Sequence, residues 1–180
     1  MRNPLIVLAA ALLLAAPAMA QDEPARQSGP VFAEFGSWRA VDSGQTLDVS
    51  QEFKAIFDTV RGGRDGEPNP RFDSAARYMN LLVSHGVPSE NVNVAVVVHG
   101  PAIWDVTTDE AYHRKSHGEG NPSRAMVQTM LAQGVQFIVC GQSALGQGIS
   151  NEDLLPGVTM ALSQTVATSV LHSQGFTNIP

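Results

Sequence analysis

The sequence predicts an α/β fold, a three-layer α/β/α sandwich around a mainly parallel sheet of about five strands. Apolar, strand-like runs alternate with helix-like segments, and three of these segments end at a glycine that precedes an apolar stretch. The runs at 93–99 and 135–140 are apolar almost throughout, which is typical of parallel strands covered on both faces. Such alternation requires crossover connections, and therefore helices on both sides of the sheet.

The first strand and helix are predicted after residue 52. Phe53–Val60 is short and rich in residues that favour strands, and a loop of Gly, Asp and Pro follows it. Asn69 then stands at an N-cap position, with Pro70 at the first helical position. Gly86 is placed to end the helix. The apolar residues that recur at helical spacing between these ends are Phe72, Ala75, Ala76, Met79, Leu82 and Val83.

The same order of elements repeats in the middle of the chain. Asn93–His99 predicts a strand, and Asn121-Pro122 opens a helix in the same way as the earlier Asn-Pro pair. Gly134 closes this helix, and Val135–Cys140 predicts the next buried strand.

The last part of the chain predicts one more strand and helix. The strand is Gly157–Leu162, and the helix runs from Ser163 to Gln174 with Gly175 at its end. The final segment, Phe176–Pro180, is too short to be more than an edge strand.

The amino-terminal part predicts a cleavable signal peptide at Met1–Ala20. An arginine precedes an apolar stretch, and Ala18-Met19-Ala20 fits a cleavage site. Pro17 makes the stretch too short for a transmembrane helix, so we expect no membrane span after cleavage and a periplasmic or secreted protein. We expect residues 21–50 to form an irregular arm and residues 51–180 to form the α/β domain. Three aromatic residues can pack the arm against that domain: Phe32, Phe35 and Trp38.

The charge and the cysteine content limit the classes of partner that the protein can bind. The formal net charge is −6 and no basic cluster occurs, which argues against nucleic acid and anionic lipid. The single cysteine cannot form a disulfide within the chain, so its thiol is either buried and inert, paired with another chain, or functional.

Two predicted strands end in residues that can do chemistry. Ligands of open parallel sheets bind beyond the carboxyl ends of the strands, which selects His99 and Cys140. Cys140 is the candidate catalytic thiol, because the glycines of 141–148 allow backbone amides to favour a thiolate. The alternative is a small buried cysteine without a role in function. If the two strands are neighbours, we expect ligand-binding residues in one crevice at His99, Asn121, Gly141, Gln142 and Ser143.

Other familiar motifs do not fit. The segment 141–148 lacks the Gly-Lys-Ser/Thr of a P-loop, and Ser143 is not in a Gly-x-Ser-x-Gly turn. His113 and His117 are spaced for zinc on a helix, but Arg114-Lys115-Ser116 lie between them and glycines follow. A solvated helix end is the preferred interpretation, so we expect no metal site and no cofactor.

These segments resemble the DsrE/DsrF-like family of sulfur-relay proteins, in a secreted branch. The resemblance rests on Val94–His99, Asn121-Pro122, Cys140-Gly141-Gln142-Ser143 and Pro156-Gly157-Val158, and its most specific element is Cys140 with Gly148 beyond it. It implies a five-stranded α/β/α sandwich, assembly as a homotrimer or homohexamer, and a Cys140 thiol able to carry a persulfide.

Two functions follow as hypotheses. The preferred one is an exported, oligomeric module that binds a small ligand or a partner in the crevice at Cys140. The alternative is a thiol-based sulfur carrier or sulfurtransferase, in which Cys140 is the persulfide-bearing nucleophile. Whether the protein is an enzyme is left open by the sequence.

Overall fold

The structure is a computed structural model that describes residues 23–64, 66–116 and 120–180. Its centre is a five-stranded sheet in the order β6-β5-β4-β3-β7, and every pair of neighbours is parallel. The strands are β3 (Phe53–Thr59), β4 (Val92–Val98), β5 (Gln136–Cys140), β6 (Thr159–Ala161) and β7 (Thr177–Ile179).

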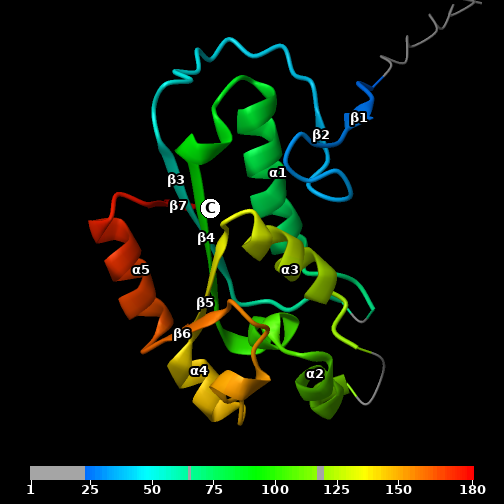
Figure 1. Cartoon of the computed structure of the whole chain (residues 1–180), viewed down its shortest axis with the longest axis vertical. Coiled ribbons are helices and arrows are strands. Elements are labelled where there is room, and N and C mark those ends of the chain that lie inside the picture. Colours follow the sequence, from blue (N-terminus) through cyan, green and yellow to red (C-terminus); the bar gives the residue numbers. More distant parts are fainter. Residues whose placement is uncertain (1–22, 65, 117–119) are drawn as a thin grey trace, which may run out of the picture.

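Helices cover both faces of this sheet. Figure 1 shows α1 (Pro70–Ser84) and α3 (Arg124–Ala132) on one face and α5 (Gln164–Ser173) on the other. The three-layer α/β/α sandwich predicted from the sequence is therefore confirmed. Shorter elements connect the layers: α2 (Asp109–Ser116), α4 (Gly141–Gly146), and the 3₁₀ helices η1 (Ser89–Asn91), η2 (Gly100–Val106) and η3 (Asn151–Asp153).

The core lies mainly between the sheet and the α1–α3 layer. Residues 94–98 of β4 are at most 1% exposed, which confirms the central, doubly covered strand. Phe72 of α1 and Phe137 of β5 meet edge to face with ring centroids 5.2 Å apart. On the opposite face α5 buries a smaller cluster of Ile56, Ala95, Val97, Ala167, Leu171 and Phe176.

The three predicted glycine stops are also confirmed. Gly86, Gly134 and Gly175 follow α1, α3 and α5 with φ of 94°, 83° and 87°. A residue with a Cβ rarely adopts this conformation, so glycine ends the helix and turns the chain back to the sheet.

Three local predictions need correction. The helix expected to open at Asn121-Pro122 begins at Arg124, with a turn before it. Residues 141–146 form the short helix α4, where the sequence suggested a glycine loop. Helix α2 was predicted only as a solvated helix end near His113, and its start at Asp109 was not, because half of its residues are charged and it has no apolar stripe.

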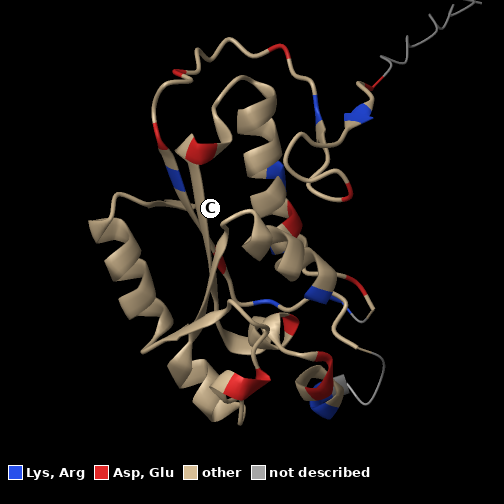
Figure 2. Ribbon diagram, in the orientation of Figure 1, with Lys and Arg blue, Asp and Glu red and all other residues tan. Residues whose placement is uncertain are grey.

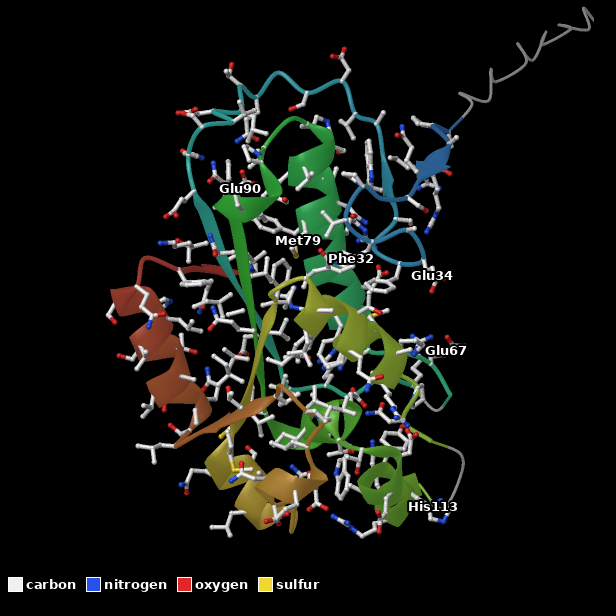
Figure 3. All side chains as sticks on the ribbon, viewed as in Figure 1. Phe32, Glu34, Glu67, Met79, Glu90 and His113 are labelled. Carbon is white, nitrogen blue, oxygen red and sulfur yellow. The ribbon has the colours of Figure 1, made fainter. Side chains whose placement is uncertain are left out.

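The arm of residues 23–50 packs on α1. It contains a short antiparallel pair, β1 (Arg26–Gln27) with β2 (Trp38–Arg39). Phe32 is 1% exposed and belongs to the core, which confirms the expected packing, and Figure 3 shows it where the arm meets α1. Asn80 of α1 is fully buried and fixes the arm. Its Oδ1 accepts from the amides of Val31 and Phe32, and its Nδ2 donates to the carbonyls of Phe32, Phe35 and Gly36.

Within the described ranges, no helix has the length and apolar character needed to cross a membrane. The predicted signal peptide, Met1–Ala20, lies outside the described residues.

Candidate functional site

The site lies at the carboxyl edge of the sheet, on the face covered by α5. Side chains alternate between the two faces of a strand. Ile56 and Val97 pack against α5, so Asp58 and His99, two residues further along, continue onto the same face. Cys140 follows Ile138 of β5 in the same way. Three neighbouring strands therefore present an acid, a histidine and a thiol in a row.

His99 is held by Asp58. Its backbone remains extended beyond β4, with φ −146° and ψ 175°, and its amide donates to the Thr59 carbonyl at 3.0 Å. The imidazole Nε2 lies 3.0 Å from Asp58 Oδ2. When Nε2 carries the proton and donates it to the carboxylate, Nδ1 is the ring nitrogen able to accept another. The two side chains are 24% and 37% exposed, so water reaches the pair.

Cys140 lies where β5 ends and α4 begins, and it is 6% exposed. Burial raises the pKa of its thiol, but N–H and O–H groups near the sulfur outweigh burial and hold the pKa below its ordinary value. These groups are the hydroxyl and amide of Ser143 and the amides of Gln164 and Gln142. The donors thus converge from α4 and from the first residue of α5, and the arrangement favours a thiolate.

Gly141 has a packing role beside the thiol. A Cβ built on it would lie 2.5 Å from the Ala161 carbonyl oxygen, so only glycine lets α4 start this close to β6. Gln142 is exposed, and its Nε2 donates to the Leu162 carbonyl at 3.4 Å. The structure therefore brings Gly141, Gln142 and Ser143 together at Cys140, with His99 on the adjacent strand; whether they bind a ligand remains a prediction.

Asn121 occupies a different place. It is 6% exposed and lies before α3, where its Nδ2 donates to the carbonyls of Trp104, Asp105 and Thr107. No hydrogen bond joins it to Cys140 or His99 among the residues that the structure describes. Its contacts hold η2 and the start of α3 together.

Sequence reasoning missed Asp58 and Gln164. Asp58 stands at the end of a predicted strand, so the carboxyl-edge rule that selected His99 also applies to it. Gln164 contributes only its backbone amide, which carries no residue-specific signal. Of the histidine pair weighed for zinc, His113 is exposed on α2 and His117 lies outside the described residues. The described residues contain no group of three His, Cys, Asp or Glu placed to hold a metal ion.

Comparison with solved structures finds proteins of similar fold. Two solved structures are similar to the chain: a protein of unknown function, MTH1491, from Methanobacterium thermoautotrophicum, and the ychN protein from E. coli. The first has 16% identity and a TM-score of 0.48 over 71% of this chain and 98% of the other. The second has 18% identity and a TM-score of 0.49 over 72% and 99%. No curated protein matches the sequence.

The family model for DsrE/DsrF-like proteins matches residues 54–179, which include the Cys140 edge and, apart from Phe53, all five strands of the central sheet. The chain belongs to the DsrE/DsrF-like family.

Proposed function

We propose that this protein is a thiol-based sulfur carrier that accepts a sulfane sulfur on Cys140 and passes it on. The observation that supports this most is the position of Cys140 between β5 and α4 at the carboxyl edge of the sheet, where one hydroxyl and three backbone amides lower the pKa of its thiol. A thiolate is the nucleophile in sulfur transfer, and the same donors stabilise the negative charge of a persulfide. Family membership favours the same chemistry.

The transfer step is simple in atoms and charge. The Cys140 thiolate attacks the outer sulfur of a donor persulfide, a new S–S bond forms, and the donor's S–S bond breaks. The electron pair of the broken bond leaves on the donor's own sulfur as a thiolate. No external oxidant or reductant is required. His99, one strand away and held by Asp58, is positioned to exchange the proton that the thiol or persulfide loses.

A second function remains in competition: a module that binds a small ligand or partner at this edge without turnover. Its support is the 6% exposure of Cys140, which leaves little of the side chain open to a donor. The chain also has no second cysteine to resolve a mixed disulfide.

Cyanide-labile sulfur on the purified protein separates the two functions. A carrier is expected to release thiocyanate after incubation with a low-molecular-weight persulfide, and Cys140→Ser is expected to release none. Alkylation by iodoacetamide in the native state should proceed below the ordinary thiol pKa of about 8.5. Ser143→Ala is the matched variant: it keeps the sulfur, removes one donor, and should shift the alkylation profile to higher pH. A native thiol that resists alkylation and never carries sulfur would contradict the sulfur carrier and favour the binding module.

We also propose that the protein is exported. The charged residue, apolar stretch and Ala18-Met19-Ala20 pattern of Met1–Ala20 support cleavage before Gln21. Amino-terminal sequencing of the protein recovered from its own host is expected to begin at Gln21. Recovered protein that still begins at Met1 would contradict export by this route.

We propose further that copies of the chain associate through α5 and β6. Leu162, Val166 and Val170 are 75%, 42% and 50% exposed, beside a hollow of about 410 Å³ that Ile138 and Met160 line. Figure 2 shows α5 without a charged residue along its length. Exposed apolar surface of this kind marks an interaction site. Light scattering is expected to report an oligomer that Val166→Glu dissociates, whereas Val41→Glu on the arm leaves it intact; a wild-type monomer would contradict the proposal.

A further inference from the structure

A hollow of about 540 Å³ lies where β3 ends and α1 begins, beyond the Asp58–His99 pair. Its wall includes three arginines, Arg61, Arg64 and Arg71, together with Asp58 and Ser74. The chain has only 11 lysines and arginines and a net charge of −6. Three of its few cations thus line one opening, and Asp58 is the one carboxylate among its described lining residues.

The three arginines are not equivalent. Arg71 is committed to the protein, because its guanidinium donates to the carbonyls of Asp58, Ile179 and Pro180 and lies over the Phe57 ring at 4.9 Å. Arg61 and Arg64 are exposed, and neither guanidinium group has a hydrogen-bond or ion-pair partner among residues 23–64, 66–116 and 120–180. Their guanidinium groups are available to a ligand.

A second hollow contains arginines that are paired with carboxylates of the chain, and it serves as a comparison. It lies between the arm and α1, has a volume of about 310 Å³, and is lined by Arg26, Arg39 and Arg77. There Arg39 is paired with Glu23 at 3.0 Å and Arg77 with Asp73 at 2.7 Å. Two of these three charges are met by carboxylates of the chain, whereas Arg61 and Arg64 have no such counter-ion among the residues that the structure describes.

Hydrogen bonds to Asp105 and Asn69 fix the backbone of the loop that carries Arg61 and Arg64. The Gly63 amide donates to Asp105 Oδ2 at 2.7 Å, and Asn69 Nδ2 donates to the Arg61 carbonyl at 3.0 Å. Asp105 is 2% exposed, and both bonds are partly shielded from water. A backbone held in this way presents two guanidiniums from a fixed base, which lowers the entropic cost of binding.

The hollow and the thiol belong to one edge of the sheet. Asp58 both lines the hollow and contacts His99, and Cys140 lies one strand beyond His99. Neighbouring strands are about 4.8 Å apart, so β3 and β5 are separated by about 10 Å.

We propose that Arg61 and Arg64 bind the anionic group of a small organic ligand whose other end reaches along the carboxyl edge of the sheet to Cys140, two strands from β3. The anionic group is a carboxylate or a phosphate, since both match the planar guanidinium. The anion site stands on its own residues. Its use to hold a sulfur donor rests on the proposed function.

Calorimetric titration of the full chain with inorganic phosphate, and separately with succinate, tests the site and identifies the preferred group. Wild type is expected to bind at least one of them, and the double variant Arg61→Gln/Arg64→Gln to bind about tenfold or more weakly. Arg26→Gln in the second hollow, an exposed arginine away from the proposed site, is the control and should bind as wild type does. Both arginines of the double variant are exposed, so an unchanged melting curve is expected to confirm its fold.

Three outcomes would overturn the site: no binding by wild type, equal binding by the double variant, or equal loss in Arg26→Gln. Cys140→Ser separates this inference from the proposed function, because it should keep anion binding and lose only the cyanide-labile sulfur. Anion binding that needs Arg61 and Arg64 in a protein that never carries sulfur would support the site and contradict the carrier. Sulfur loading without anion binding would support the carrier and contradict the anion site.

Discussion

Two Asn-Pro pairs begin the same way and end in different structures. In both, the asparagine Oδ1 accepts a hydrogen bond at 2.9 Å from the amide two residues on, that of Arg71 in one case and Ser123 in the other. After Asn69 the helix starts at once, at Pro70. After Asn121 the chain makes a turn, and α3 starts only at Arg124.

The difference lies in what each side-chain amide reaches. Asn69 Nδ2 donates to Asp105 Oδ2 and to the Arg61 carbonyl, so it joins a helix cap to the arginine loop. Asn121 Nδ2 donates to three carbonyls of 104–107 and so closes the loop around η2. The dipeptide determines a local bond, and distant partners determine whether that bond caps a helix or ties a loop.

The largest effect is expected from Asn121→Leu. This change keeps the volume and leaves buried carbonyls at Asp105 and Thr107, and the Ser123 amide, without their partners. The free energy of unfolding should fall by about 3 kcal/mol or more, measured by urea denaturation. Asn151→Leu, at an exposed asparagine of η3, is the control and should change it by about 0.5 kcal/mol or less. Equal effects would mean that the loop contacts around η2 contribute little.

A smaller loss is expected from Asn69→Ala, about 2 kcal/mol in the same measurement, because a cap and a buried donor are both removed. Asn69→Ser divides these parts. Serine restores the acceptor for the helix amide and not the donor to Asp105, so it should recover about 1 kcal/mol. Full recovery by serine would show that Asn69 acts as a cap alone.

The two regions touch at Ser123, whose Oγ accepts from the Asn69 amide at 2.9 Å. Ser123→Ala should cost about 1 kcal/mol, because it leaves that buried amide unpaired. If the regions are coupled, the effects of Ser123→Ala and Asn69→Ala measured together will differ from their sum. Simple additivity in the double variant would show two independent structures.

The smallest effect concerns pH, at Asp105, which both asparagines contact. Burial raises the pKa of Asp105 above 3.8, and the bonds from Gly63 and Asn69 and the charge of Lys115 lower it only in part. The folded state then keeps a proton that the unfolded state has released, so this group's contribution to stability falls as pH rises above about 3.8. Asp105→Asn removes the titration, and its deficit relative to wild type should shrink as the pH rises. A constant deficit would contradict the raised pKa.

The sheet was predictable because its signals are local. Apolar strands and glycine helix ends are encoded in consecutive residues. Val94 to Val98 are buried and Gly134 has a positive φ, as those signals predict. The carboxyl-edge rule also selected His99 and Cys140, and the structure shows that their strands, β4 and β5, are neighbours. Contacts between distant residues were not predictable: Asp58 meets His99 across 41 positions, and Asn69 meets Ser123 across 54.

The family match begins at residue 54, yet the arm before it supplies part of the interior. If the arm were trimmed away, Asn80 would lose five hydrogen bonds and the slot that Phe32 fills would open to water. We therefore expect the shared region of this chain to be less stable without the arm. The arm and the residue at position 80 are expected to be inherited as a pair, and a chimera that exchanges one without the other should fold poorly.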